Sequence, residues 1–342
     1  MADELELDEQ PQELYEHHRI NVDQGQEMLR IDKYLQMHLQ GISRNKIQAA
    51  AKAECIRVND KVVKTNYRVK PLDVITILLP EPPHNFELIP EKIDFHIVYE
   101  DEDVLVVDKQ AGLVVHPGVG NWTGTLLNGL LYYFGDKATP FLVHRIDKDT
   151  SGLLLIAKNE EAQVILAKQF FEHTIERKYN ALVWGDFDVD DGTITGNLGR
   201  SAQDRRVMCV YPHEEGVPEE LQKGKHAVTH WHVIERFGYV TLVECVLETG
   251  RTHQIRAHMR HIGHPLFSDA AYGGDAILKG TTFSKYKQFV ENCFEVLPRQ
   301  ALHARVLGFT HPRTGKKLHF ESPLPEDMES CIARWRNYTG SK

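Results

Sequence analysis

The side chains most able to do chemistry are Arg145, Asp147 and Asp149, which lie together between two apolar runs. These runs, residues 141–143 and 153–157, are typical of strands, so the polar stretch between them is predicted to be an elbow with fixed side chains. A carboxylate in such an elbow can act as a nucleophile, as a base, or as support for a positive charge. This pattern alone favours the simpler alternative, in which the two aspartates only cap the turn, as Asx residues often do.

A second candidate is Tyr179, in the apolar stretch of residues 176–183. Side chains alternate along a strand, so Tyr179 is expected on the same inward side as Ala181 and Val183. Lys178 is expected on the opposite side, either solvated or near backbone phosphates. Spacing alone favours a core residue, since an inward tyrosine is more often packed than chemically active.

A third candidate is Arg256, which follows a strand that is expected to end at Gly250. A helix is expected from about Thr252, with an apolar stripe and a polar face beside it. The stripe consists of Ile255, Met259 and Ile262, and the polar face of His253, Arg256 and Arg260. Arg256 could be a solvated residue of this face, or a charged partner that keeps a secluded carboxylate ionised.

The histidines of this segment do not follow a metal-binding pattern. His253 and His258 are five residues apart, whereas two ligands on one helical face lie about four apart. His258 and His261 are three apart, and no nearby cysteine or carboxylate completes a set. We therefore expect no metal site, and no motif for another cofactor is evident.

Composition places the chain among globular cytoplasmic proteins. Its 342 residues suggest about two domains that can each bury a core. No apolar run approaches the roughly 20 residues of a membrane helix, and the acidic residues 1–16 do not resemble a secretory signal. The five cysteines are scattered without a pairing pattern, as expected in a reducing cytoplasm.

The net charge of −9 is distributed unevenly along the chain. Residues 1–27 hold nine acidic residues and one arginine, whereas residues 28–78 hold ten basic and four acidic residues. The first segment is too poor in apolar residues to fold alone and is expected to be a flexible acidic extension. The second segment carries a local positive field of the kind that attracts RNA.

The basic segment is expected to form a small domain, residues 28–79. Apolar residues at helical spacing begin at Ile31, a second helix is expected to end at Lys52, and residues 56–63 indicate a hairpin before a closing strand at 74–78. The basic residues expected to contact RNA are Arg44, Lys46, Lys52, Arg57 and Lys61.

A proline-rich linker, residues 80–90, is expected to separate this domain from a larger one, residues 91–330, with a C-terminal tail at 331–342. Strand and helix patterns are interspersed in the larger domain without regular alternation. This predicts an α+β fold with a central mixed, mainly antiparallel sheet flanked by helices.

Several motifs resemble those of one enzyme family, and they occur in the order found in that family. Residues 144–152, His-Arg-Ile-Asp-Lys-Asp-Thr-Ser-Gly, are similar to the His-Arg-Leu-Asp-x-x-Thr-Ser-Gly signature of the RluA family of RNA pseudouridine synthases. Residues 176–183 resemble the second family motif, and residues 249–256, Thr-Gly-Arg-Thr-His-Gln-Ile-Arg, resemble the third. Residues 30–78 resemble the S4 RNA-binding module.

The resemblance implies a reaction that needs no cofactor. Isomerising uridine to pseudouridine breaks the N1–C1′ bond, turns the uracil, and rejoins it through C5. Asp147 corresponds to the essential catalytic aspartate, and Asp149 remains a turn residue. Tyr179 is expected to stack on the uracil and to aid proton transfer, and Arg256 is expected to pair with Asp147.

The resemblance also implies base flipping, which costs a few kcal/mol. Arg145 corresponds to the arginine that enters the gap left by the flipped nucleotide; an ordinary surface contact to phosphate or carboxylate is its alternative. Arg251 is a further candidate for RNA contact in the same environment.

Residues 115–118, 120–121 and 324–328 look most like the RluD type, whose members modify large-subunit ribosomal RNA. We therefore expect a cytoplasmic 23S rRNA pseudouridine synthase that acts on free rRNA or on an assembling ribosomal subunit. A tRNA-directed synthase and a non-catalytic RNA-binding assembly factor are the alternatives. The presence of Asp147, Tyr179 and Arg256 argues against the non-catalytic factor.

Overall fold

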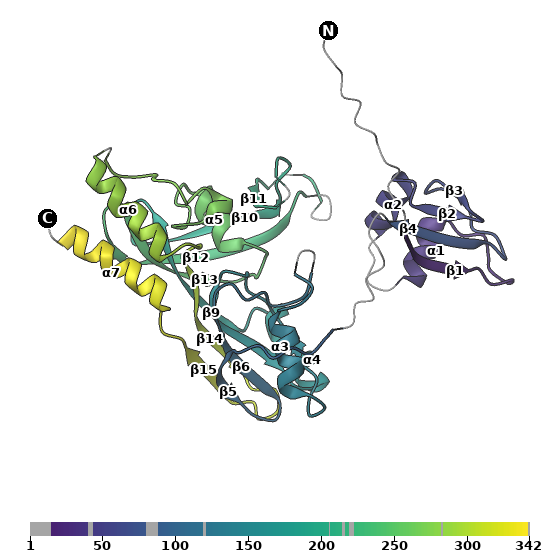
Figure 1. Ribbon diagram of the computed structural model, residues 1–342, viewed down its shortest axis with the longest axis horizontal. Coiled ribbons are helices and arrows are strands. Elements are labelled where there is room, and N and C mark those ends of the chain that lie inside the picture. The colour runs from purple at the N-terminus through teal and green to yellow at the C-terminus, as the bar shows by residue number, and fades with distance from the viewer. Residues whose placement is uncertain are drawn as a thin grey trace, which may run out of the picture. The chain divides into compact units, whose positions relative to one another are not determined.

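The chain separates into two compact units, Met1–Glu87 and Leu88–Lys342 (Figure 1). The computed structural model describes residues 15–39, 44–79, 88–118, 121–204, 206–213, 216–218, 222–281 and 283–340. Most of the expected linker, residues 80–90, falls outside these ranges. Within them, no helix combines the length and the apolar character that crossing a membrane requires.

The first unit is a four-stranded antiparallel sheet with two helices. Its strands run in the spatial order β1-β4-β2-β3, and they are β1 (Tyr15–Asn21), β2 (Ile56–Val58), β3 (Lys61–Val62) and β4 (Val74–Leu79). The helices are α1 (Ile31–His38) and α2 (Arg44–Lys52). Ile31, Ile47 and Ile75 bring both helices and β4 into one core. The predicted pair of helices, the hairpin and the closing strand are confirmed.

Residues 15–21 correct the expectation that residues 1–27 form a flexible extension. They form β1, which pairs antiparallel with β4 and places Ile20 opposite Ile75. Val22, directly after the strand, is buried in the core of this unit. Without β1, one edge of β4 would be left with open N–H and C=O groups. Backbone pairing therefore compensates for the low apolar content of this segment.

The second unit is built on one eleven-stranded mixed sheet. Its strands are β5 (His96–Glu100), β6 (Val104–Lys109), β7 (Phe141–Leu142), β8 (Ser151–Ala157), β9 (Glu176–Trp184), β10 (Asp191–Arg200), β11 (Met208–Tyr211), β12 (Lys225–Arg236), β13 (Val240–Leu247), β14 (Leu302–Thr310) and β15 (Lys317–Glu321). The order is β11-β10-β12-β13-β9-β14-β8-β6-β5, with β15 beside β14 and β7 beside β8. Among the described strands, only β14 and β8 pair in parallel, which confirms the predicted mixed, mainly antiparallel sheet.

Helices cover both faces of this sheet. They are α3 (Leu126–Phe134), α4 (Glu160–Phe171), α5 (Gln254–His261), the 3-10 turn η2 (Ala270–Tyr272), α6 (Ser284–Val296) and α7 (Glu326–Gly340). On β9, Leu182 and Trp184 pack with α6 and α7, whereas Tyr179 and Val183 share a core with α3 and α5. Because side chains alternate along a strand, these two sets lie on opposite faces.

The expectation of a C-terminal tail at residues 331–342 is wrong for residues 331–340, which are helical. Helix α7 continues to Gly340, and Cys331, Ile332 and Trp335 are buried on it. Trp335 packs edge-on against Trp184, with ring centroids 6.3 Å apart. Together with Met328, these residues follow the helical spacing of an apolar stripe. This stripe made α7 detectable, and residues 331–340 belong to the second unit.

Candidate active site

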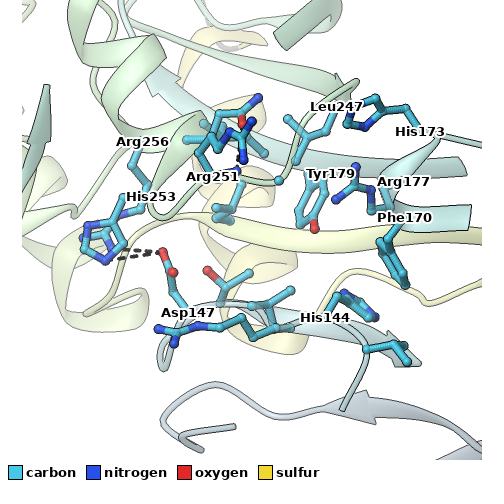
Figure 2. Close-up of a pocket in the computed structure, with 18 of the residues that line it drawn as sticks. His144, Asp147, Phe170, His173, Arg177, Tyr179, Leu247, Arg251, His253 and Arg256 are labelled. Carbon is cyan, nitrogen blue, oxygen red and sulfur yellow. Dashed lines mark hydrogen bonds and ion pairs between the residues drawn. The ribbon is translucent and has the colours of Figure 1, made fainter. Parts of the chain in front are cut away.

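The three sequence motifs, which are far apart in the chain, meet at one cavity of about 500 Å³ (Figure 2). The elbow before β8 contributes Asp147, β9 contributes Tyr179, and the start of α5 contributes Arg256. The end of α4 forms a further wall with Phe170. The cavity therefore collects a carboxylate, an aromatic ring and several cations on the sheet face that carries α5.

Two buried cations hold the backbone of the elbow that carries Asp147. Lys109 donates from Nζ to three carbonyl oxygens, including that of Lys148 at 2.8 Å. Burial lowers the pKa of Lys109, and the negative charges of Asp149 and Asp147 oppose the shift. The three carbonyls use all three N–H bonds of the ammonium group. Arg299 donates from Nη1 to the carbonyl of Asp149, also at 2.8 Å. The predicted elbow is thus confirmed, and contacts within the protein hold its backbone.

Gly152 fixes where β8 begins behind the elbow. Its φ is +109°, and a Cβ atom there would lie 2.3 Å from the carbonyl oxygen of Ala304. A larger residue would be strained and would clash with β14. Glycine thus permits the parallel approach of β8 and β14 that places Asp147 at the cavity.

Asp147 forms an ion pair with Arg256, as the resemblance implied. Nη1 of Arg256 lies 3.1 Å from Oδ2 of Asp147, while its Nε and Nη2 donate to the two carboxylate oxygens of Asp269 at 2.7 and 2.8 Å. Arg256 is buried, so it does not lie on a solvated helix face. Burial opposes its charge, yet the hydrogen bonds and charges of Asp269 and Asp147 raise its pKa above the ordinary value. Asp147 therefore faces a permanently charged, oriented donor.

Asp269 and His253 complete the surroundings of Asp147, and the sequence had not identified either role. Asp269 is 1% exposed and orients Arg256 from a loop before η2. His253 places Nε2 3.9 Å from Oδ2 of Asp147, while its Nδ1 bonds to the hydroxyl of Tyr272. A lone aspartate in a loop gives no sequence signal of burial, so Asp269 could not be recognised from its spacing.

Tyr179 faces inward, as the alternation along β9 predicted. It is buried in the same core as Ala181 and Val183, and burial raises the pKa of its hydroxyl. Its hydroxyl has no hydrogen-bond partner among the described residues. Lys178, on the opposite side, is partly exposed and lies within 4.0 Å of Glu176 and Glu244. The tyrosine ring thus forms an apolar wall with one polar atom available to a ligand.

The rim of the cavity carries the exposed arginines Arg145 and Arg251. Arg251 donates from Nε to the carbonyl of His226 at 3.1 Å, so this nitrogen of its guanidinium group is already engaged. The two guanidinium groups provide positive charge at the entrance, where a polyanion would approach.

In the first unit, the basic residues expected to contact RNA differ in how far they are exposed and engaged in contacts within the protein. Arg44 donates to the buried carboxylate of Asp32, its nearest oxygen at 2.8 Å, and thereby joins α2 to α1. Burial opposes ionisation of Asp32, but hydrogen bonds from Arg44, Gln48 and Arg30 hold its pKa well below the ordinary range. Lys52 and Lys61 are exposed, Arg57 is partly buried, and the side chain of Lys46 lies outside the described residues.

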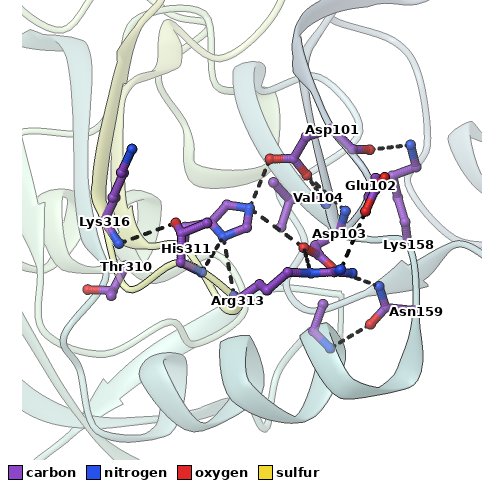
Figure 3. Close-up of polar contacts among 12 residues, drawn as sticks. Asp101, Glu102, Asp103, Val104, Lys158, Asn159, Thr310, His311, Arg313 and Lys316 are labelled. Carbon is purple, nitrogen blue, oxygen red and sulfur yellow. Dashed lines mark hydrogen bonds and ion pairs between the residues drawn. The ribbon is translucent and has the colours of Figure 1, made fainter.

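Figure 3 shows a second polar cluster, none of whose residues lines this cavity. Asp101, Asp103 and His311 are close enough to hold a metal ion, and they are the one such group among the described residues. Their polar atoms are already engaged: His311 Nε2 lies 2.8 Å from Asp101, and Arg313 binds both oxygens of Asp103. The cluster joins the β5–β6 turn to the β14–β15 turn.

Mild acid should lower the stability of the protein through His258, which lies on helix α5. This side chain is fully buried, and burial lowers its pKa from 6.5 to about 4. The unfolded chain therefore takes up a proton at a higher pH than the folded protein does, and stability falls as the pH drops from 6.5 towards 4. At pH 5 the expected loss is about 2 kcal/mol.

Urea unfolding of wild type and His258→Met at pH 7 and pH 5 measures this contribution. The variant should lose less stability on acidification than wild type. His232→Gln, at an exposed position of β12, is the matched control and should keep the wild-type pH dependence. Equal acid sensitivity of wild type and His258→Met would show that His258 does not titrate as proposed.

Comparison with known proteins gives matches for both units. A family model described as RNA pseudouridylate synthase matches residues 103–261, and the S4 domain model matches residues 29–75. An uncharacterized RNA pseudouridine synthase of Chlorobaculum parvum is 46% identical over 93% of this chain and 97% of that relative. Ribosomal large subunit pseudouridine synthase D of Nitrosomonas europaea is 40% identical over 90% of this chain and 85% of that relative.

The solved structure of human RNA pseudouridylate synthase domain containing 4 shares the fold, with a TM-score of 0.55. It is 23% identical in sequence and covers 70% of this chain and 93% of its own. The identity and coverage of the curated relatives, and the meeting of all three motifs at one cavity, establish the family. The chain belongs to the RNA pseudouridine synthases, enzymes that isomerise uridine, and it carries an N-terminal S4 domain.

Proposed function

We propose that this enzyme isomerises specific uridines of large-subunit (23S) ribosomal RNA, with Asp147 as its catalytic carboxylate. The observation that carries the proposal is the cavity in which Asp147, anchored by Arg256, lies near the buried ring of Tyr179. The choice of target rests on relatives named ribosomal large subunit pseudouridine synthase D, at about 40% identity over most of the chain.

The reaction defines a role for each of these side chains. The N1–C1′ bond breaks, the uracil turns, C5 bonds to C1′, and the proton that leaves C5 is balanced by one gained at N1. Asp147 must be ionised whether it attacks the sugar carbon, removes a sugar proton, or supports a sugar cation. Arg256 orients that carboxylate by donating to it from Nη1 at 3.1 Å. Tyr179 supplies a ring on which the detached base can stack and a hydroxyl for proton transfer.

The partial burial of the Asp147 carboxylate, which is one-fifth exposed, supports a route in which the uridine leaves its stack. Enzymes that act on a stacked base extrude it at a cost of a few kcal/mol. Arg145, exposed at the rim, is suited to enter the gap that the nucleotide leaves. Arg251, also at the rim, would contact the flanking phosphates.

The S4 domain should contribute phosphate contacts through Lys52 and Lys61. Each phosphate contact releases counterions, so the logarithm of RNA affinity falls with the logarithm of salt concentration. Lys52→Gln with Lys61→Gln should reduce that slope by about 1.4 to 1.8, the share of two contacts. Filter binding at several salt concentrations measures the slope.

The control for this pair is Lys285→Gln with Lys287→Gln on α6, which removes two lysines from the other unit. It should leave the slope unchanged. If the S4 pair also leaves it unchanged, these two lysines do not hold the RNA.

Incubation of wild-type enzyme with unmodified large-subunit rRNA and with tRNA, followed by pseudouridine mapping, tests the proposed target. New pseudouridine at defined rRNA positions supports the proposal. Modification of tRNA alone would show that tRNA is the target, and it would leave the proposed chemistry unchanged. Absence of modification in both RNAs, with rRNA offered free and within assembling subunits, would contradict the proposed target.

A further inference from the structure

Arg177 is a buried cation in the active-site cavity for which the proposed mechanism gives no role. It lies on β9 two residues before Tyr179, so both side chains point to the same face of the sheet. Arg177 is 7% exposed, and its Nε is buried without a hydrogen-bond partner. No carboxylate within the described ranges forms an ion pair with it. A permanently charged side chain of this kind normally has a buried partner.

Packing alone holds the guanidinium group in place. Its centre lies 5.4 Å from the centroid of the Phe170 ring, which in turn stacks on His144 at 4.7 Å. On another side, a Cβ atom at Gly250 would lie 2.7 Å from Nη1 of Arg177. The absence of a side chain at Gly250 therefore makes room for the guanidinium group. The packing around Arg177 therefore orients its guanidinium group, but no described carboxylate neutralises its charge.

The carboxylates of the cavity and the nearby His144 are already engaged elsewhere. Asp147 and Asp269 are both bound to Arg256. His144 accepts the N–H of Leu155 through Nε2, so its other ring nitrogen carries the proton and also donates. The Arg177 side chain forms no hydrogen bond within the described residues, so its donors are available to a ligand in the cavity.

An RNA substrate offers two kinds of acceptor, a phosphate and a base carbonyl. Of the exposed arginines at the rim, Arg251 is placed for phosphates, which remain at the surface of the RNA, and Arg145 for the gap that the nucleotide leaves. Arg177 is buried, and Figure 2 shows Tyr179 between it and Asp147. If Asp147 meets the sugar and Tyr179 meets the ring, the far edge of the base faces Arg177.

We propose, building on the proposed function, that Arg177 donates hydrogen bonds to the carbonyl of the flipped uracil that lies farthest from the sugar. In uridine this atom is O4, because C4 is opposite N1 in the ring. Turning the ring about its N3–C6 axis exchanges N1 with C5 and O4 with O2. The carbonyl opposite the new bond is then O2, in the same place. One fixed donor can thus serve the base before and after it turns.

This contact also gives Arg177 a catalytic effect. When the N1–C1′ bond breaks, its electron pair remains on the base, and the negative charge spreads over N1, O2 and O4. A buried, pre-oriented guanidinium stabilises that charge and keeps its own proton throughout. Cytosine presents an amino donor where uracil presents O4, and arginine has only donors. The same side chain therefore favours uracil over cytosine.

Arg177→Met tests the proposal, since it removes the donors and keeps an unbranched side chain. Lys178→Met, one residue along β9 and facing the opposite side, is the matched control. The probe is an RNA in which wild type forms pseudouridine, so a wrong target class would appear as absent wild-type activity. We expect Arg177→Met to lower the single-turnover rate at saturating RNA by about 10² to 10³-fold. RNA affinity and its salt dependence should stay as in wild type, and Lys178→Met should keep the wild-type rate.

A normal rate at saturating RNA would overturn the proposal. So would weaker RNA binding with a smaller salt dependence, because that result identifies a phosphate contact.

Replacing O4 of the target uridine by sulfur provides a second test that does not need a folded Arg177→Met variant. Sulfur is a weaker acceptor, so 4-thiouridine should change the rate of wild type through its contact with Arg177. Arg177→Lys keeps one charged donor but loses the planar fork, and it should show a smaller response to the sulfur. Equal responses of wild type and Arg177→Lys would contradict a contact between Arg177 and O4.

Discussion

Asp147→Asn should abolish pseudouridine formation while leaving a folded protein that still binds RNA. The amide keeps the shape of the side chain but removes its negative charge, which every proposed route requires. Loss of one such group in other enzymes slows the reaction by about 10⁴-fold or more. Single-turnover assays of pseudouridine formation measure the rate.

The elbow should survive this substitution because its backbone is held by Lys109 and Arg299, not by the Asp147 side chain. RNA affinity should therefore remain close to that of wild type. Asp149→Asn, two residues along the same elbow, is the matched control and should retain activity. Comparable losses in the two variants would mean that the elbow, and not the Asp147 carboxylate, is what the reaction needs.

Arg256→Met should damage both stability and catalysis. It leaves Asp269, which is 1% exposed, without its two hydrogen bonds, and it leaves Asp147 without its cation. Breaking a buried ion pair from one side costs about 3–5 kcal/mol of unfolding free energy. The reaction should slow by about 10² to 10³-fold, as when a positioned charge is removed from an active site.

Adding Asp269→Asn separates the two effects. Without its charge, residue 269 no longer needs a buried cation, so the double variant should regain part of the lost stability. Its activity should stay low because Asp147 still lacks Arg256. Recovery of activity together with stability would show that Arg256 serves the fold alone.

The sequence predicted the site residues that belong to contiguous motifs. Asp147 was expected in an elbow between two strands, Tyr179 on the inward side of its strand, and Arg256 as a partner for Asp147. The structure brings all three together at one cavity. Short-range patterns suffice here because strand alternation and motif order determine which side chains face the same space.

The remaining features depend on contacts that no local pattern encodes. Asp269 and Arg177 are charged residues that are buried through contacts with other segments. Asp269 contacts Arg256, and Arg177 packs against Phe170 and Gly250. Alternation along β9 does place Arg177 beside Tyr179, so its inward direction was open to prediction.

Two segments were assigned wrongly for different reasons. Strand β1 is stabilised by pairing with β4, which the acidic composition of residues 1–27 as a whole does not reveal. Helix α7 carries an apolar stripe that ends in Trp335, and this signal was available in the sequence.

Pseudouridine mapping of large-subunit rRNA, after incubation with wild type and with Asp147→Asn in parallel, tests the central claim most directly. We expect new pseudouridine at defined positions with wild type and at none of them with Asp147→Asn. The same modified positions with both proteins would contradict the assignment of Asp147 as the catalytic carboxylate.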